Sequence, residues 1–256
     1  MKLNFKKSGS GKPLIILHGL FGSLDNWQTM AKTFSAHFTT YIVDLRNHGQ
    51  SPRSKEWSYQ AMADDLLELI ESENLENLIV LGHSMGGKTA MLFAVQHPDK
   101  LSKLIVADIA PRKYVPHHQT ILEALHTVDV ENISSRKEAE ERLSEHINDI
   151  STKQFLLKNL YWKDIDAKKL DWRFNLDAIS ENIEKIGIAI PDDSPVKDLP
   201  TLFIKGEKSE YITISDNNLI QKIFPKAEIE TIKGAGHWLH AEKPEEFFDL
   251  VMEFAG

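Results

Sequence analysis

A serine stands between two glycines in the segment Gly82–Gly86, which reads GHSMG. The apolar run Leu78–Leu81 comes before this segment, and a stretch that favours helix comes after it. A strand, a sharp turn and a helix form the context in which a G-x-S-x-G motif exposes its serine as a nucleophile. The turn strains the backbone at the serine, and side chains at the two glycine positions would collide with the adjacent strand and helix. We therefore predict that Ser84 is a nucleophile; an incidental serine in a glycine-rich turn is the alternative.

A serine hydroxyl becomes a good nucleophile when a base takes its proton, and histidine titrates in the useful pH range. The chain has 11 histidines. His237 follows the loop Gly234–Gly236, just after the last predicted strand, and it comes after the serine in chain order, as this motif requires. We expect His237 to be the base; a loop histidine packed near Trp238 is the alternative. The other candidates are expected elsewhere: His18 and His48 as braces of loops, His83 pointing away from the serine, and His240 in solvent.

Attack of a serine on a carbonyl group creates an oxyanion, which needs two converging hydrogen-bond donors. The Met85 N–H is one predicted donor, because the amides at a helix N-terminus point outward. The second donor is expected in the turn after the second predicted strand, where His18 and Gly19 precede Leu20. We predict that the Leu20 N–H is this donor; a turn that serves packing alone is the alternative.

Apolar runs that alternate with amphipathic segments must position these residues. The predicted strands are Leu3–Lys7, Pro13–Leu17, Thr39–Asp44, Leu78–Leu81, Leu101–Ala107, Leu199–Lys205 and Ala227–Lys233. Predicted helices lie between them, at Asn26–His37, Tyr59–Ser72 and Ser215–Phe224, and a terminal helix follows Pro244. Near-continuous apolar strands joined through helices predict a mostly parallel central sheet with helices on both faces. The serine and the histidine base are then expected at the carboxyl edge of this sheet.

The strand signal disappears between Arg112 and about Pro195, where helical patterns replace it. Helices are expected at Glu123–Val130, after capping boxes that begin at Ser135 and Ser151, and at Asn175–Ile186. We predict an all-helical cap over residues 112–195, inserted into a core that residues 1–111 and 196–256 form. Four aromatic residues of the cap could line an acyl pocket or could simply pack onto the core: Phe155, Trp162, Trp172 and Phe174.

The composition is that of an ordinary globular protein, with 41% hydrophobic and 27% charged residues in a chain of 256. The absence of cysteine excludes disulfides, thiolate nucleophiles and cysteine metal sites. A formal net charge of −8 argues against general affinity for nucleic acids. The first residues lack the layout of a signal peptide, and no apolar run approaches membrane-spanning length, so we expect a soluble, cytoplasmic protein. A metal pair at His117 and His118 is a weak alternative, and neither a metal nor a cofactor is expected.

Four motifs stand in the order found in the α/β-hydrolase superfamily, which the chain resembles over nearly its whole length outside the cap: His18–Gly19, Asp44–Ser51, Gly82–Gly86 and Gly234–His237. Finer features resemble the YbfF-type esterases and the related mitochondrial abhydrolase-domain proteins: His18–Trp27, Arg46–Gly49, Ala107–Pro111 and Trp172–Asn175. The resemblance implies the α/β-hydrolase fold and hydrolysis of carboxylic esters or acyl thioesters without a cofactor. It also implies a structural role for Asp44.

The pattern also requires an acid that orients the base. Most relatives carry it in a Gly-x-x-Asp turn, but the matching turn Gly206–Ser209 of this chain ends in serine. Asp108 ends the strand that follows the serine's strand, so it should stand at the same edge of the sheet. Pairing with His237 would offset the cost of burying this carboxylate. The resemblance also supports Asp108; the alternatives are that Asp108 only caps a turn, or that Glu210 is the acid.

Two classes of function follow from these residues. The first is a serine esterase that acts on esters or thioesters of small to medium acyl groups through a Ser-His-Asp triad and an acyl-enzyme. The second is a small-molecule-binding protein that has lost its chemistry, which the presence of both Ser84 and His237 disfavours. Carbon–carbon bond hydrolases and lyases of this fold share the serine and are the alternative among enzymes. Six basic residues against three acidic ones between Ser151 and Arg173 indicate a path for anionic acyl groups or acyl-CoA, although a solvated surface explains them as well.

Overall fold

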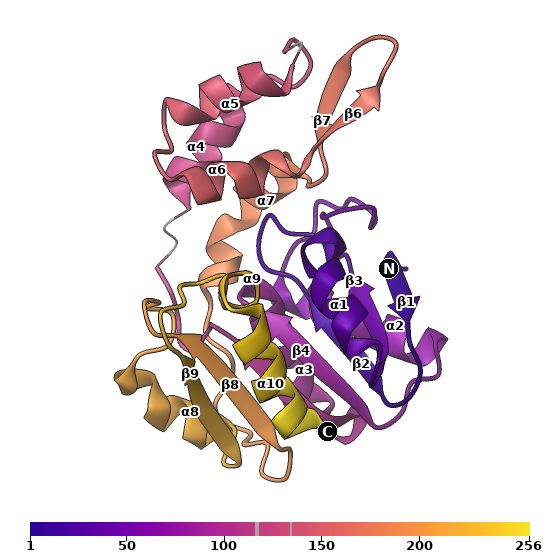
Figure 1. The fold of residues 1–256 in the computed structure, drawn as a ribbon. Coiled ribbons are helices and arrows are strands. Elements are labelled where there is room, and N and C mark those ends of the chain that lie inside the picture. The colour runs from indigo at the N-terminus through magenta and orange to yellow at the C-terminus, as the bar shows by residue number, and fades with distance from the viewer. Residues whose placement is uncertain (116–117, 134) are drawn as a thin grey trace.

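The computed structural model describes residues 1–115, 118–133 and 135–256, and a seven-stranded sheet forms its centre (Figure 1). The strands are β1 (Phe5–Ser8), β2 (Pro13–Leu17), β3 (Thr39–Val43), β4 (Leu78–His83), β5 (Leu101–Ala107), β8 (Thr201–Gly206) and β9 (Ala227–Ile232). Their order is β1-β3-β2-β4-β5-β8-β9. β1 pairs antiparallel with β3, and the other neighbours pair parallel. This sheet confirms the predicted mostly parallel architecture.

Helices cover both faces of the sheet because successive residues of a buried strand point to opposite sides. Ile15 and Leu17 of β2 belong to a core shared with α2 (Tyr59–Ser72), α3 (Met85–Gln96) and α8 (Asn217–Ile223). Leu14 and Ile16 belong to a second core, shared with α1 (Gln28–Phe34), the short helix α9 (Leu239–Glu242) and α10 (Pro244–Ala255). Both faces of the strands are therefore apolar, as the near-continuous apolar runs predict.

The chain between β5 and β8 contains the predicted insertion of residues 112–195, and its helices lie above the sheet in Figure 1. Its helices are α4 (Gln119–Thr127), α5 (Arg136–Ser144), α6 (Ile150–Leu157) and α7 (Leu176–Asn182), and a 3-10 turn at Ile183–Gly187 follows them. Ser135 caps α5, since its hydroxyl accepts a hydrogen bond from the Glu138 N–H at 3.2 Å. The helix start predicted at this serine is confirmed, and this bond is one of the two that define the predicted capping box.

Two details of the insertion differ from the sequence-based expectation. An antiparallel hairpin of β6 (Leu160–Asp164) and β7 (Lys169–Trp172) interrupts the helices, so the insertion is not all-helical. Leu170 and Trp172 alternate inward along β7, but so short an alternation gives little signal in the sequence. In addition, α6 begins at Ile150 and is capped by Asp149, not by the predicted box at Ser151.

The register of the parallel strands brings their carboxyl ends to one edge. Leu17 of β2 lies beside Gly82 of β4, His83 lies beside Ala107 of β5, and Ala107 lies beside Ile204 of β8. The segments that follow these strands therefore emerge side by side. None of the helices in the described residues combines the length and apolar character needed to cross a bilayer.

Candidate active site

Ser84 occupies the sharp turn between β4 and α3, with φ 53° and ψ −116°. This positive φ is costly for any residue with a side chain. The flanking glycines explain how the turn closes: a Cβ on Gly86 would lie 2.5 Å from the Leu17 carbonyl oxygen, and a Cβ on Gly82 would collide with the backbone of Gly86. The Ser84 N–H donates to the Ala107 carbonyl at 3.0 Å, which fixes the turn against β5.

Asp108 and His237 form a hydrogen-bonded pair at the same edge of the sheet. The His237 Nδ1–H donates to Asp108 Oδ2 at 2.7 Å. The carboxylate is fully buried, whereas the imidazole keeps 24% of its surface exposed. Because Nδ1 carries the proton toward the carboxylate, Nε2 of the neutral ring holds a free lone pair. The pair thus joins a buried carboxylate to a partly exposed imidazole, the two side chains that the sequence predicts to lie together.

Two further donors satisfy the buried Asp108 carboxylate. The Gly206 N–H donates to Oδ1 at 3.0 Å, and the Ser209 hydroxyl donates to Oδ2. Ser209 is the residue that stands where most relatives were expected to carry the acid. Its hydroxyl still reaches the same place and supports the carboxylate that comes from β5. Burial of a charged group is tolerated when donors surround it in this way.

Glu210, the alternative acid, lies in a different environment. Its side chain is exposed, and the contact that the structure records is from Arg112 Nη2 to its backbone carbonyl, at 3.3 Å. Its neighbour Glu207 accepts a hydrogen bond from the Gly234 N–H at 2.8 Å, and so supports the loop that leads to His237. Neither glutamate pairs with His237 within the described residues.

Tyr211 and His83 hold the His237 loop beside Ser84. The Tyr211 ring stacks on the His237 ring, with centroids 4.2 Å apart, and lines the same pocket as Ser84. His83, which immediately precedes Ser84, donates from Nε2 to the His237 carbonyl at 2.8 Å. The structure records no hydrogen bond between Ser84 and His237 among its described residues. Such bonds are often long before substrate binds.

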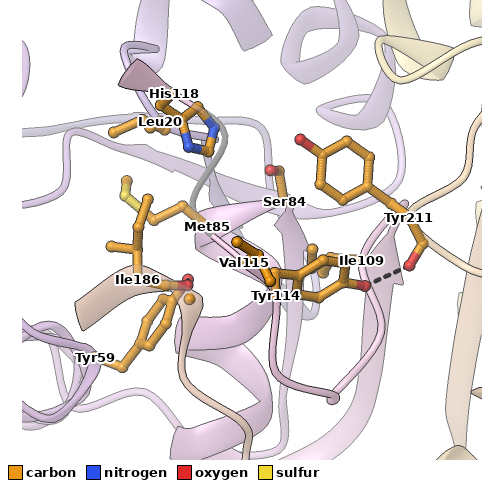
Figure 2. A pocket seen from close by; sticks show the side chains of 11 residues that line it. Leu20, Tyr59, Ser84, Met85, Ile109, Tyr114, Val115, His118, Ile186 and Tyr211 are labelled. Atoms are coloured by element: carbon orange, nitrogen blue, oxygen red, sulfur yellow. Dashed lines mark hydrogen bonds between the residues drawn. The ribbon is translucent and has the colours of Figure 1, made fainter. Parts of the chain in front are cut away.

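Ser84 opens into a pocket (Figure 2). Apolar and aromatic side chains provide most of its wall: Leu20, Tyr59, Met85, Ile109, Tyr114, Val115, Ile186 and Tyr211, together with His118 and Gly187. Within the described part of the chain, the N–H groups of Leu20 and Met85 donate no hydrogen bond. The pocket therefore brings a hydroxyl and two free backbone donors next to an apolar cavity.

The four aromatic residues predicted to bind substrate do not line this pocket. Trp172 stacks on Phe174, with ring centroids 5.2 Å apart, and Phe174 packs against Phe21. Phe155 packs against Trp238, while Trp162 lies on the hairpin with 38% of its surface exposed. The packing alternative is therefore correct for Trp172 and Phe174, whose side chains are nearly fully buried.

Sequence reasoning missed the tyrosines and Ile186 because they come from separate segments. Tyr59 begins α2, Tyr114 follows β5, Ile186 lies in the 3-10 turn Ile183–Gly187, and Tyr211 follows β8. Only Tyr114 and Tyr211 had a usable signal, since each lies a few residues beyond the carboxyl end of a parallel strand. Ligands bind in that region of open α/β sheets.

His18 and His48 brace the loops, as predicted. His18 donates from Nδ1 to the Gly19 carbonyl at 2.8 Å and accepts the Leu45 N–H at Nε2. His48 donates from Nδ1 to the Arg46 carbonyl and accepts the Phe21 N–H. Burial lowers the pKa of His18 to about 4 and that of His48 to about 3, so both rings stay neutral at pH 7.

Asp44 satisfies loop amides, in agreement with its predicted structural role. Its carboxylate accepts the Leu24 N–H at 2.7 Å, the Gln50 N–H at 2.9 Å and the Asn4 side-chain amide at 2.7 Å. A Cβ on Gly49 would overlap this carboxylate, and Gly49 also has a φ of 58°. Both features favour glycine at this position.

The prediction that His240 is solvated is wrong. His240 is 5% exposed and stacks on Trp27, with ring centroids 4.1 Å apart. Its helix α9 turns this side chain toward the core beneath His83, and burial lowers the pKa of His240 to about 3. The metal pair considered at His117 and His118 includes His117, which lies outside the described residues.

Comparison with known proteins identifies relatives of the whole chain. The family model described as the alpha/beta hydrolase fold matches residues 12–130. The chain is 36% identical to esterase YbfF of Escherichia coli (strain K12), over 99% of both chains. It is 39% identical to the sn-1-specific diacylglycerol lipase ABHD11 of Mus musculus, over 94% of this chain and 80% of the relative. A solved structure described as a marine microorganism esterase is 49% identical over 99% of both chains, with a TM-score of 0.95. By its sequence and its fold, the chain belongs to the α/β-hydrolase family.

Proposed function

We propose that the protein is a serine esterase that hydrolyses carboxylic esters or acyl thioesters of small to medium acyl groups. The observation that carries the proposal is the Asp108–His237 hydrogen bond at the sheet edge where the strained turn exposes Ser84. The names of the relatives support it, since esterases and a lipase all cleave ester bonds. The largely apolar and aromatic wall of the pocket suits an acyl chain.

The reaction would begin when Nε2 of His237 takes the proton of the Ser84 hydroxyl. The Ser84 oxygen attacks the acyl carbonyl carbon, and the carbonyl oxygen becomes an oxyanion that accepts hydrogen bonds from the Leu20 and Met85 N–H groups. Asp108 holds the imidazole in the Nδ1–H tautomer and stabilises the imidazolium. The imidazolium then protonates the leaving alcohol or thiol, which leaves an acyl-enzyme at Ser84.

Deacylation repeats these steps with water. His237 takes a proton from a water molecule, the resulting hydroxide attacks the acyl carbon, and the Ser84 oxygen leaves with the proton returned by His237. The insertion of residues 112–195 would act as a lid in this scheme, because its first and last segments contribute Tyr114, Val115, Ile186 and Gly187 to the pocket. A lid of this kind keeps bulk water away from the acyl group.

The test compares Ser84→Ala with Ser102→Ala. Ser102 lies at the amino end of β5, opposite the edge at which Ser84 stands, and its hydroxyl donates to the Asn77 and Leu78 carbonyls. We expect the wild type and Ser102→Ala to react with a fluorophosphonate probe and to hydrolyse p-nitrophenyl acetate and butyrate. Ser84→Ala should lose labelling and about a millionfold in kcat, as serine nucleophile knockouts do elsewhere.

Labelling or turnover that persists in Ser84→Ala would refute the assignment. Wild-type protein that folds but neither labels nor hydrolyses any ester or thioester would point to the binding-only alternative. Parallel assays with thioesters of the same acyl groups decide between the two leaving-group classes.

A further inference from the structure

Lys88 is a buried cation that the proposed reaction does not use. Its side chain is fully buried in α3, one turn after Ser84. No carboxylate pairs with Lys88 in the described residues. Lysines on the surface, in contrast, do form salt bridges with carboxylates. Its position in the first turns of α3 adds repulsion from the positive end of the helix dipole. A buried ammonium without a carboxylate is costly, so its local contacts indicate what it does.

The Lys88 ammonium joins two segments that are far apart in the sequence. Nζ donates to the Arg112 carbonyl at 2.6 Å and to the Ile188 carbonyl. It also lies over the Tyr114 ring, 5.0 Å from the centroid, and over the Tyr59 ring at 5.9 Å. Two carbonyl oxygens and two aromatic faces together replace the water and the carboxylate that a buried cation lacks.

These two segments form what we call the neck, residues 111–115 and 186–190, through which the chain enters and leaves the insertion. The Tyr114 N–H donates to the Gly187 carbonyl at 2.7 Å, and the Ile190 N–H donates to the Pro111 carbonyl at 2.8 Å. The Tyr59 hydroxyl donates to the Ile186 carbonyl at 2.9 Å. The neck is therefore tied to itself by backbone bonds, and to the core by Lys88 and Tyr59.

The neck is also one wall of the pocket. Tyr114, Val115, Ile186 and Gly187 line the cavity into which Ser84 points (Figure 2). Lys88 is bound to the same turn as the serine, since its N–H donates to the Ser84 carbonyl at 3.0 Å. A shift of the neck relative to α3 would thus change the distance between this wall and the serine. Lys88 is placed to prevent such a shift.

We propose that Lys88 is a positioning residue that fixes the neck against α3 and thereby sets which acyl groups fit the pocket. This inference rests on the proposed esterase function for its substrate and on the geometry of the neck for its mechanism. Acetyl groups would touch little of the wall, whereas a longer acyl chain would lie along Tyr114 and Ile186. The effect of losing Lys88 should therefore grow with acyl length.

Burial, and secondarily the Arg112 charge, lower the pKa of Lys88 to about 7. The neutral amine keeps two N–H donors, enough for both carbonyls, so the two contacts do not depend on the proton. An apolar side chain of similar size would avoid the desolvation cost but would leave the Arg112 and Ile188 carbonyls unpaired.

The test is Lys88→Met, which keeps the length and apolar volume of the side chain but removes the donors. Lys103→Met is the matched control: Lys103 also donates to a backbone carbonyl, that of Phe254, and lies over an aromatic ring, but it sits at the start of β5. We compare kcat/KM for a hexanoate ester with kcat/KM for an acetate ester. In Lys88→Met the hexanoate-to-acetate ratio should fall about tenfold, because KM for the hexanoate rises. One or two misplaced methylene groups produce an effect of this size.

Lys103→Met should leave that ratio unchanged, even if it lowers stability equally. An unchanged ratio in Lys88→Met, or an equal change in Lys103→Met, would overturn the proposal. Tyr59→Phe, which removes only the hydroxyl bound to Ile186, should shift the ratio in the same direction by less. This milder variant keeps the test valid if Lys88→Met does not fold.

Hydrogen exchange separates this inference from the proposed function. The Tyr114 and Ile190 amides donate the neck bonds, and in Lys88→Met they should exchange about tenfold faster than in wild type or Lys103→Met. If the wild type hydrolyses no ester, the proposed function fails while this measurement still reports on the neck. Unchanged exchange in Lys88→Met would overturn the role of Lys88 by itself.

Discussion

Two buried aspartates end parallel strands at the same edge of the sheet, and their surroundings differ. Asp44 follows β3, and Asp108 follows β5; both are almost completely buried. Asp44 accepts two backbone amides and one side-chain amide, all of which are fixed parts of loops. Asp108 accepts one backbone amide and one hydroxyl, and its third donor is the ring of His237, which solvent can reach.

The neighbouring histidines differ in the same way. Near Asp44, His18 and His48 use both ring nitrogens on backbone groups and are kept neutral by burial. Near Asp108, His237 uses Nδ1 on the carboxylate, and the described residues record no hydrogen bond to its Nε2. A buried aspartate with histidines nearby therefore occurs in both regions. The partly exposed imidazole that pairs with Asp108 distinguishes the second region from the first.

Replacing the two aspartates in turn should give the largest contrast. Asp108→Asn presents an amide to His237 and favours the wrong imidazole tautomer, so we expect kcat for p-nitrophenyl acetate to fall by about a thousandfold or more. Asp44→Asn should instead lower the free energy of unfolding by about 1–3 kcal/mol, since it weakens the loop bonds, while kcat stays near the wild-type value.

Steady-state kinetics and urea unfolding of the purified variants measure both effects. The comparison between the two regions would fail if Asp44→Asn lost as much kcat as Asp108→Asn in folded protein. It would also fail if Asp108→Asn lost stability alone.

A smaller effect should appear in the pH dependence of stability. Burial lowers the pKa of His18, His48 and His240 from 6.5 to about 4, 3 and 3. Between these values and about 6.5 the unfolded chain binds more protons than the folded chain, so the free energy of unfolding falls as the pH falls. Each histidine contributes up to about 1.4 kcal/mol per pH unit.

His240→Phe isolates one of these contributions, because a phenyl ring can keep the stack on Trp27 and the His240 Nδ1 has no hydrogen-bond partner in the described structure. Urea unfolding at several pH values between 4 and 7 should show a shallower slope in this variant by about one proton. Equal slopes would mean that His240 already titrates at its ordinary pKa in the folded protein.

The core was predictable from the sequence because its strands are apolar on both faces and end in glycine or polar residues. Pro13–Leu17, Tyr59–Ser72 and Leu101–Ala107 have the predicted bounds. Strand order also determines that the residues after β4, β5 and β9 meet at one edge, so the proximity of Asp108 and His237 followed from the pattern. Their catalytic roles, and that of Ser84, stay predictions.

The hairpin, the buried His240 and the pocket wall were not predictable, because they depend on tertiary contacts that no local sequence pattern encodes. The β6–β7 hairpin has only short alternations, and the histidine on α9 faces inward because of Trp27, which lies more than 200 residues earlier in the chain. The pocket wall combines residues near positions 20, 59, 110, 186 and 211. Aromatic residues of the insertion were conspicuous in the sequence, yet Trp172 and Phe174 pack onto each other and onto Phe21.

The smallest expected effect concerns Glu210, the third carboxylate near this edge. Its side chain is exposed and makes no contact with His237 in the described residues, so removing its charge should change little. Exposed substitutions usually cost less than about 0.5 kcal/mol, a factor of about two. We therefore expect Glu210→Gln to keep kcat within about twofold of wild type, measured beside Asp108→Asn with the same substrate. A thousandfold loss in Glu210→Gln with nearly full activity in Asp108→Asn would move the acid to Glu210. That outcome would require the turn after β8 to rearrange when substrate binds, because the Ser209 hydroxyl now donates to Asp108 and the Tyr211 ring stacks on His237.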